Sequence, residues 1–499
     1  MNQPSKLAAF LLFLPFGLQA QPYDLVVYNA ENIFDADGIA VYDDYKTPGY
    51  TPRHVLTKVR NVAAVMARYN AGNGPDVIVF NEIEADQSQS AWNAMPAAEF
   101  LNRWEGRTLK SMLTSDFDAT VADIPSELLI LKAMAEAGMT GYEVVTGYAP
   151  LGPDGKPTHA IKNVVFSRLP VNHDRTRRHE VEDARPILEV WLDVKGQELA
   201  VFANHWKSGA SNPQMERARL QNATVLKARL DELRATDPRV DAILAGDFNS
   251  DYNQSQRYGS TMPRTGVNTV LKSTGNETKV AGGTILPHDS VYNLWYELPV
   301  DQRKSDHFRG FWGTLMQIMI TPGMYDQSGV FYIDNSFEVG RWPGFNAYST
   351  SGTPIRWSAF GDGYGYADHF PLHMRFDVSA LSDTVRIEMR HPSAENGPDW
   401  SPLPVVHRMP EAGEYIEAGS VTGTLRTATY FDRLFLVTAE VVADNRVRVN
   451  GEEYELFAPA FRVQDRFTGK IGQQTTFYAR LGQFRGRWQF VIDAEAYIR

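Results

Sequence analysis

Four apolar, strand-like runs of the sequence each end in polar groups that packing alone does not require. They end at Asn29, at Glu82, at His205 and in the Gly-Asp-Phe-Asn of residues 246–249. Buried strands that carry such groups to one edge of a sheet can assemble a site from distant parts of a chain. Carboxylate and amide oxygens suit hard divalent cations, and imidazole and carboxylate groups suit acid–base chemistry. Taken singly, each residue is more often a solvated loop residue or a cap, so the set as a whole carries the prediction.

The elements that must position these groups are mixed α and β. Strand-like apolar runs alternate with helical or loop stretches from Tyr23 to about Val378. The strand-like runs are 24–28, 76–81, 162–166, 187–194, 199–204, 242–245, 315–320 and 373–376, and the helical runs are 57–69, 127–137 and 215–234. This alternation indicates an α+β domain that needs a large core.

The end of the chain has a different character. Residues 379–412 are rich in Pro and Ser, which is typical of a linker. From Gly413 nearly all of the chain resembles strand, and Asn450-Gly451 is a strong signal for a tight hairpin turn. We therefore predict four parts: a signal peptide at 1–20, a large domain at 21–378, a linker at 379–412 and a small β domain at 413–499.

Composition excludes several classes of protein. The 499 residues are 43% hydrophobic and 12% aromatic, enough for a large core in two or three domains. The chain has no Cys, which rules out disulfides, thiolate zinc sites and cysteine nucleophiles. Any metal must be held by oxygen or imidazole. The formal net charge of −11 also gives no global positive field, so a nucleic acid would have to be bound at a local site.

The first twenty residues are expected to direct export. A short basic segment containing Lys6 precedes an apolar run from Leu7 to Leu14, and Ala20 supplies a small residue for cleavage. The alternative, a membrane anchor, needs about 20 uninterrupted apolar residues, and Pro15 breaks this run early. No later stretch is long and apolar enough to span a bilayer. We expect a soluble mature protein that is secreted or periplasmic.

Five motifs occur in an order that resembles the endonuclease/exonuclease/phosphatase superfamily, which has the DNase I-like fold, and in particular its secreted bacterial branch. They are Asn-Ala-Glu-Asn-Ile-Phe-Asp at 29–35, Asn-Glu-Ile-Glu at 81–84, Asn-His-Trp-Lys-Ser at 204–208, Gly-Asp-Phe-Asn at 246–249 and Asp-His-Phe-Pro-Leu at 368–372. The resemblance covers residues 23–378. It implies a four-layered α/β/β/α sandwich of two packed, mainly antiparallel sheets.

The resemblance also implies roles for individual residues. Phosphate ester cleavage must stabilise developing negative charge, which a divalent cation does well. The implied metal ligands are Glu82, Asn29 and Asp368, and Mg²⁺ is the expected ion, with Mn²⁺ and Ca²⁺ as alternatives. The implied catalytic residues are Asp247 for the attacking water, Asn249 for a phosphate oxygen, His205 and His369 on either side of the phosphate, and Arg185 as a phosphate contact. For Arg185 a surface salt bridge is the competing interpretation.

The sequence departs from the family pattern at one position. The family carries Leu-Asp on the penultimate core strand, and that Asp orients the terminal His, but here the matching residue is Met316. A thioether cannot replace this hydrogen bond, so His369 would be handicapped unless another carboxylate substitutes. Asp306 and Asp362 are the candidates. Asp306-His307 also resembles the terminal Asp-His motif, but Asp368-His369 fits better because Pro371 and a strand follow it.

The C-terminal domain is predicted to be an OB-like barrel. Such barrels present aromatic and cationic side chains to single strands of nucleic acid. Here Arg480, Arg485, Arg487 and Trp488 are the candidates for nucleic-acid binding. The alternative is that the alternating aromatics only form the core face of the barrel.

Together these observations predict a secreted, divalent-metal-dependent phosphodiesterase, specifically a nuclease that cleaves DNA or RNA with little sequence preference. Its partner would be a nucleic acid or another phosphate ester, and we expect a monomer. A phosphatase or a phospholipid phosphodiesterase of the same fold is the alternative enzyme. A catalytically weakened nucleic-acid-binding protein is the alternative from another class.

Overall fold

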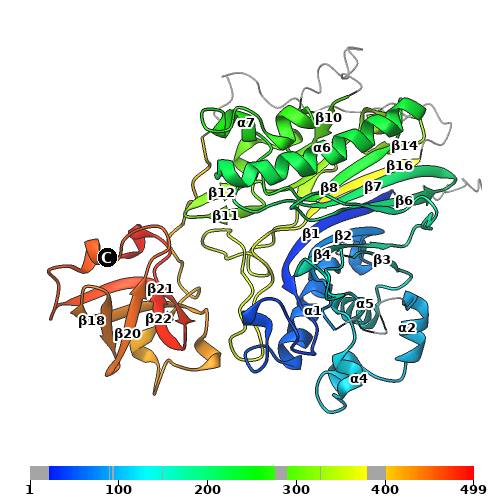
Figure 1. Cartoon of the computed structure of the whole chain (residues 1–499). Coiled ribbons are helices and arrows are strands. Elements are labelled where there is room, and N and C mark those ends of the chain that lie inside the picture. The colour runs from blue at the N-terminus through cyan, green and yellow to red at the C-terminus, as the bar shows by residue number, and fades with distance from the viewer. Residues whose placement is uncertain are drawn as a thin grey trace, which may run out of the picture.

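The computed structural model describes residues 22–88, 90, 92, 95–148, 150–275, 289–325, 328–378 and 401–499. The predicted signal peptide and residues 379–400 of the predicted linker lie outside the described residues. The described chain forms a large two-sheet domain and a small β-barrel beside it (Figure 1). No helix in these residues combines the length and the apolar character needed to cross a bilayer.

The first sheet of the large domain has the strand order β14-β16-β1-β2-β4-β3, with β15 paired to β16. Its strands are β1 (Tyr23–Ile33), β2 (Val77–Glu84), β3 (Glu143–Gly147), β4 (Ile161–Ser167), β14 (Val330–Tyr332), β15 (Glu338–Val339) and β16 (Leu372–Val378). The long strands β1 and β2 run parallel, while the other pairs are antiparallel.

The second sheet has the order β5-β6-β7-β8-β13-β10-β9. Its strands are β5 (Arg177–His179), β6 (Ile187–Val194), β7 (Gln197–His205), β8 (Ala242–Asp247), β9 (Ser273–Thr274), β10 (Val291–Asn293) and β13 (Met316–Ile320). The central pair, β7 and β8, is parallel, and β13 joins β8 in the antiparallel direction. Each sheet therefore places one parallel pair at its centre.

Four layers result because residues along each strand alternate between two cores. On β1, Leu25 and Val27 point into the core between the two sheets, where they join Val201 of β7 and Ile318 of β13. Val26 belongs instead to the core under the helices. The sequence prediction of an α/β/β/α sandwich is confirmed.

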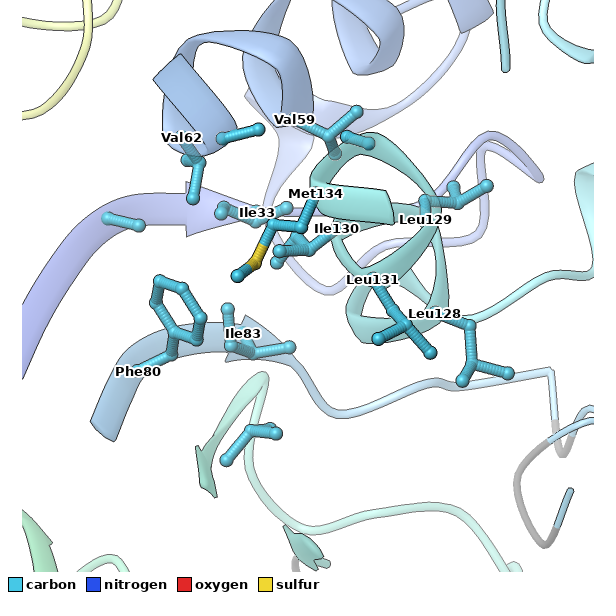
Figure 2. Packing of buried hydrophobic residues seen from close by; sticks show 14 of the residues in the cluster. Ile33, Val59, Val62, Phe80, Ile83, Leu128, Leu129, Ile130, Leu131 and Met134 are labelled. Carbon is cyan, nitrogen blue, oxygen red and sulfur yellow. The ribbon is translucent and has the colours of Figure 1, made fainter. Parts of the chain in front are cut away.

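The helices cover the outer faces of the two sheets. The first sheet carries α1 (Pro52–Met66) and α5 (Ser126–Glu136), with the shorter α2 (Ala97–Arg103), α3 (Leu109–Met112) and α4 (Ala119–Ala122) alongside. Figure 2 shows Ile130 and Met134 of α5 packed with Val62 of α1 and with Phe80 and Ile83 of β2. The second sheet is covered by α6 (Pro213–Thr236), and the short α7 (Gln254–Tyr258) follows β8. The long helices α1 and α5 lie against β1 and β2, and α6 lies against β7 and β8, which are the strands that carry the polar groups.

The C-terminal domain is a closed five-stranded barrel of OB-like topology, as predicted. The strands β18 (Leu434–Ala443), β19 (Arg446–Val449), β20 (Glu452–Phe457), β22 (Arg487–Val491) and β21 (Gln474–Phe484) pair in that order, and β21 pairs back to β18. The short helix α9 (Gln464–Phe467) lies between β20 and β21, and β17 (Ile416–Glu417) extends β18. The predicted Asn450-Gly451 turn joins β19 to β20, with both residues at positive φ.

The two domains meet in an extensive polar and aromatic contact. Arg480 of the barrel pairs with Asp493 and Asp432, and it donates a hydrogen bond to the hydroxyl of Tyr348 in the large domain at 2.7 Å. Phe360 of the large domain stacks on Phe431 of the barrel with ring centroids 4.0 Å apart. The barrel is therefore held against the large domain by buried contacts as well as by the connecting chain.

Candidate active site

The polar groups predicted at the strand ends lie together at one end of the sandwich. Asn29 is on β1 and Glu82 is on the neighbouring β2, while His205 and Asp247 end the parallel neighbours β7 and β8. His205 and Asp247 are register partners across that parallel pair. The central pairs of the two sheets thus supply the four groups, two from each sheet.

The first residue of the Gly-Asp-Phe-Asn motif must be glycine for a steric reason. Gly246 has φ +145°, and a Cβ at this position would lie 1.9 Å from the backbone oxygen of Asn204, so only glycine fits. The next residue, Asp247, donates its backbone N–H to the side-chain oxygen of Asn81 at 2.9 Å. Its carboxylate accepts the backbone N–H of Asn249 at 2.8 Å. The motif fixes the direction in which the Asp247 carboxylate points.

Glu82 is held at a break in the regular pairing of β2. The residue has φ +62°, and the register with both neighbouring strands shifts at this point. Its two carboxylate oxygens accept hydrogen bonds from the side chain of Asn29 and from the backbone N–H of Asn32, both at 3.0 Å. A left-handed backbone in a non-glycine residue is costly, and this pairing maintains it. The irregularity aims the carboxylate at the opposite sheet.

Glu82, His205 and Asp247 form a group suited to a divalent cation. One potential ligand atom from each lies within 4.8 Å of the others. The Nε2 atom of His205 is 3.7 Å from Glu82 Oε1 and 3.8 Å from Asp247 Oδ2. Burial, together with the charges of Asp368 and Asp247, raises the pKa of Glu82 to about 7. A cation here would relieve this crowding of buried negative charge.

The other two predicted metal ligands, Asn29 and Asp368, differ in how they fit. The side-chain nitrogen of Asn29 donates to both Glu82 and Asp247 at 3.0 Å. Turning this amide over would direct its oxygen to the same place, but it would break the hydrogen bond that Oδ1 accepts from the backbone N–H of Glu31 at 3.0 Å. Asp368 is not in the group of three, and its carboxylate instead pairs with Arg356 at 3.1 Å. Of the predicted ligands, Glu82 and Asn29 are therefore the better placed.

The two predicted catalytic histidines lie on either side of Asp247. The Nε2 atom of His369 is 3.8 Å from Asp247 Oδ2, as is that of His205. Burial, with the positive charges of Arg185 and His369, lowers the pKa of His205 well below its ordinary value. Burial also acts to lower the pKa of His369, but the surrounding carboxylates, led by Asp368 and followed by Asp247, Asp306 and Glu82, raise it to about 9. The two imidazoles therefore differ in charge near neutral pH.

Arg185 and Asn249 complete the predicted set. Arg185 donates from Nε to the backbone oxygen of His205 at 2.9 Å, and a second donor contacts the backbone oxygen of Trp206. Its side chain lies against the backbone that carries His205 and lines the same cavity, which disfavours a simple surface salt bridge. Asn249 donates to the Trp206 oxygen at 3.1 Å. Every predicted catalytic residue is thus found at this end of the sandwich.

The structure also shows what surrounds Met316. It lies opposite Asp247 on β13, with its side chain buried in the core between the sheets. Asp306, one of the two substitute carboxylates considered above, forms an isolated antiparallel bridge with His369 and is buried. Asp362, the other, is on the surface and pairs with Arg53 at 3.2 Å. Asp306 is therefore the carboxylate that can act on His369.

The site lies in the wall of a cavity of about 740 Å³. Glu82, His205, Asp247 and His369 line it together with Arg185. It extends past a small hairpin of β11 (Asp306–Phe308) and β12 (Phe311–Gly313) to Pro402, just before the barrel. The hairpin therefore forms part of the wall of the cavity that contains His205.

Sequence reasoning missed several positioning residues. Asn81 donates from its side chain to Asn163 at 2.8 Å and to the Asn204 backbone oxygen at 3.0 Å, and so ties the two sheets together. Arg356 links Glu31 to Asp368. The first of the five motifs contains Glu31 and could have directed attention to it, but no motif surrounds Arg356.

The predicted nucleic-acid contacts of the barrel fall into two groups. Arg480 and Trp488 belong to the contact between domains, because Arg480 donates to the Tyr348 hydroxyl at 2.7 Å and Trp488 packs against Phe360 with centroids 5.2 Å apart. Arg487 pairs with Glu455 at 2.7 Å, and its side chain is 72% exposed. Arg485 occupies the β21–β22 turn. Only the second pair lies on an open surface.

Solved structures of low sequence identity align with this chain over most of their own length. An endonuclease/exonuclease/phosphatase family protein from Leptotrichia buccalis C-1013-b is 13% identical and aligns over 71% of this chain and 99% of its own, with a TM-score of 0.39. A mannosyl-6-phosphatase from Bacteroides thetaiotaomicron VPI-5482 is 15% identical and aligns over 71% of this chain and 99% of its own, with a TM-score of 0.32. An AP endonuclease from Archaeoglobus fulgidus is 12% identical and aligns over 71% of this chain and 100% of its own, with a TM-score of 0.36. No curated protein sequence matches the chain.

A family model supports the assignment directly from the sequence. Residues 164–377 match the model described as the Endonuclease/Exonuclease/phosphatase family. The matched segment contains His205, Asp247, Asn249 and His369, and the motif residues Asn29 and Glu82 complete the same site from the first sheet. The chain is thus similar to the Endonuclease/Exonuclease/phosphatase family over residues 164–377, the family that its five motifs resemble.

Proposed function

We propose that the protein is a divalent-metal-dependent phosphodiesterase that hydrolyses DNA or RNA with little sequence preference. The observation that carries this proposal is the convergence of Glu82, His205 and Asp247 within 4.8 Å, with the Nε2 of His369 3.8 Å from Asp247. Two carboxylates and two imidazoles around one point match the needs of a reaction at phosphorus, where negative charge and proton transfer must both be managed.

A divalent cation fits the residues present. Glu82 and Asn29, once its amide is turned, would hold it through oxygen, which Mg²⁺, Mn²⁺ and Ca²⁺ prefer. Bound there, the ion would neutralise charge on the phosphate and polarise its phosphorus–oxygen bonds. Mg²⁺ is the proposed ion.

The chain's own residues divide the remaining work. Asp247, fixed by the backbone of Asn249 and the side chain of Asn81, orients the attacking water and accepts its proton. His369, which carries positive charge, contacts the phosphate and opposes its developing negative charge. His205 hydrogen-bonds a phosphate oxygen from the other side of Asp247. Arg185 braces the backbone of His205 and adds positive charge to the cavity wall.

The assignment to nucleic acid rests on the shape and charge of the cavity. Its lining includes four arginines: Arg257 is paired with Asp251 at 2.6 Å and Arg356 with Asp368 at 3.1 Å, which leaves Arg185 and Arg309 to contact an anionic substrate. A polyanionic strand would contact both of these groups at once, whereas a single monoester would contact fewer. In a chain with a net charge of −11, this local concentration of arginine is what a polyanion needs.

The test compares four substrates on the mature chain. Plasmid DNA, RNA, sphingomyelin vesicles and p-nitrophenyl phosphate are incubated with Mg²⁺, Mn²⁺ or Ca²⁺, or with EDTA. His205→Ala and Asp247→Ala are run alongside Glu143→Gln, a carboxylate on β3 paired with His173 away from the cavity. Metal-dependent loss of plasmid or RNA that both substitutions abolish, with Glu143→Gln unaffected, is the expected result.

The alternatives give different results in the same experiment. Release from p-nitrophenyl phosphate or sphingomyelin alone would replace the proposal by a phosphatase or a phospholipid phosphodiesterase. Retention of DNA without turnover, lost in Arg485→Ala/Arg487→Ala, would replace it by a weakened nucleic-acid-binding protein.

We also propose that the protein is exported to the periplasm or the medium, on the strength of the apolar run from Leu7 to Leu14 and the small residue at Ala20. Mass spectrometry of the protein recovered from the periplasm and from the medium should show a chain beginning at Gln21. An uncleaved chain that stays in the cytoplasm would contradict this.

A further inference from the structure

The β11–β12 hairpin presents two aromatic rings at the cavity that the mechanism above does not use. Phe308 and Phe311 are register partners at the tip of the hairpin, and both line the cavity. Phe308 is 70% exposed and Phe311 is 47% exposed. Large exposed aromatic side chains that line a functional cavity are typical of ligand contacts.

The two faces of the hairpin have different roles. Side chains two residues apart on a strand share a face, so Phe308 and Phe311 lie on the same face as Asp306. On the other face, Trp312 packs into a small core with Ala347 and Phe370. One face thus anchors the hairpin, and the other carries the two exposed rings.

The anchoring makes the rings a fixed platform near the reactive groups. Asp306 at the base of the hairpin bridges to His369, and the backbone N–H of Phe370 donates to the Ser305 oxygen at 2.7 Å. At about 3.3 Å per residue, Phe308 lies about 7 Å along the strand from Asp306. The chain before the barrel holds the tip, because Val405 donates its N–H to the Gly310 oxygen at 2.8 Å. Both ends of the hairpin are therefore fixed.

We propose that Phe308 and Phe311 stack on an unpaired nucleobase next to the scissile phosphate, so that the preferred substrate is single-stranded nucleic acid. This inference rests on the proposed nuclease function. A base offers a flat π face whatever its sequence, so stacking binds single strands without sequence preference. A base-paired nucleotide has its faces covered by its neighbours and must first be unstacked to use this platform.

Charge favours a nucleotide over a lipid at this position. Arg309 lies over the ring of Phe308, 5.0 Å from its centroid, and Arg356 lines the same cavity. Arginine beside an aromatic ring binds a phosphate and a base together. The cavity around the rings also contains the carboxylates of Asp251 and Asp368, which oppose burial in an acyl layer.

The experiment compares substrates with and without a base at one position. Two single-stranded 12-mers are used, each with a single cleavable phosphodiester, while all their other linkages are phosphorothioates. The residue next to that phosphodiester is an intact nucleotide in the first 12-mer and a tetrahydrofuran abasic residue in the second. A duplex of the first 12-mer is the third substrate. Cleavage rates are measured with Mg²⁺ for the wild type, for Phe308→Ala/Phe311→Ala and for Phe117→Ala. Phe117 is another exposed phenylalanine, but it does not line the cavity.

The wild type is expected to cleave the intact 12-mer with kcat/KM about tenfold or more above the abasic 12-mer and the duplex. Phe308→Ala/Phe311→Ala should remove this preference by raising KM for the intact strand, while Phe117→Ala keeps it. Phe308→Trp should also keep it, because a larger ring still stacks.

Equal rates on the intact and abasic strands, or a preference that survives Phe308→Ala/Phe311→Ala, would overturn the inference while the nuclease function stands. The inference would also be overturned, in favour of a lipid contact, if Phe308→Ala/Phe311→Ala no longer bound sphingomyelin vesicles but cleaved DNA at an unchanged rate. If the wild type cleaves none of the three nucleic acids but hydrolyses p-nitrophenyl phosphate, the proposed function itself fails.

Discussion

Asp306 and His369 face each other across an isolated antiparallel β-bridge, which places a buried carboxylate beside the largely buried imidazole. The Nδ1 atom of His369 is buried and has no hydrogen-bond partner among the described residues. Burial raises the pKa of Asp306 to about 6, against the opposing charge of His369. Asp306 thus brings a carboxylate close to His369 from a different strand than the one that carries Met316.

Asp306→Asn should lower kcat by about 10²- to 10⁴-fold, because an amide orients the imidazole without stabilising its positive charge. Adding Met316→Asp to this variant should restore part of the loss by supplying the carboxylate from β13. Rates on plasmid DNA with Mg²⁺ provide the measurement, and thermal unfolding checks that the variants fold. Asp362→Asn, on the surface, serves as the control. An unchanged rate in Asp306→Asn would show that His369 needs no carboxylate from β11.

Glu82→Gln should weaken divalent metal binding by more than tenfold, because it removes a charged oxygen donor from the group around Asp247. Isothermal titration with Mn²⁺ measures this directly, without reference to activity. EDTA should abolish hydrolysis by the wild type, and added Mg²⁺ should restore it. Glu143→Gln should bind Mn²⁺ as the wild type does. Equal Mn²⁺ affinity in Glu82→Gln and the wild type would place the ion elsewhere.

His373 should make stability depend on pH. Its two ring nitrogens lie 2.5 Å from an Asp24 oxygen and 2.9 Å from a Glu338 oxygen, so both must donate and the imidazole must be charged. Burial acts to lower its pKa, but the two carboxylates raise it above the ordinary value. Stabilisation is therefore complete below about pH 6.5 and is lost as pH rises through the folded-state pKa, with a slope of at most about 1.4 kcal/mol per pH unit.

Urea unfolding between pH 6 and 9 measures this loss. In His373→Gln the free energy of unfolding should be lower at pH 6 and should change less with pH. The charged state assigned to His373 would be contradicted if the wild-type free energy of unfolding rose over this pH range, or if its pH dependence matched that of His373→Gln.

Arg480→Met should destabilise the barrel and its contact with the large domain by about 3–5 kcal/mol. It leaves the carboxylates of Asp493 and Asp432 without their largely buried partner and removes the hydrogen bond to Tyr348. Arg487→Met removes an exposed pair and should change stability by less than about 1 kcal/mol. Urea unfolding followed by tryptophan fluorescence compares the two, since Trp488 lies at the contact. Equal stabilities would mean that the barrel is not held through Arg480.

The sequence predicts the local features of this fold well, because they depend on short-range patterns. Apolar runs identified the core strands, and the Asn450-Gly451 turn identified a hairpin whose residues adopt the expected positive φ. The family motifs identified His205 and His369 because they are read along the chain. The link from Arg356 to Glu31 and the bridge from Asp306 to His369 could not be predicted, since each joins segments that are far apart in the sequence. The β11–β12 hairpin was not predicted either, because Asp306-His307 resembles the terminal Asp-His motif.

The register between His205 and Asp247 has a consequence for engineering. The two groups end neighbouring strands of one parallel ladder, so the spacing of the ladder itself sets their separation. The connecting segments beyond Trp206 and beyond Asn249 can therefore be exchanged for those of a distant homologue, or lengthened, without changing the separation of the reactive pair. Substrate choice can be altered in those segments while the chemistry is inherited unchanged from the sheet.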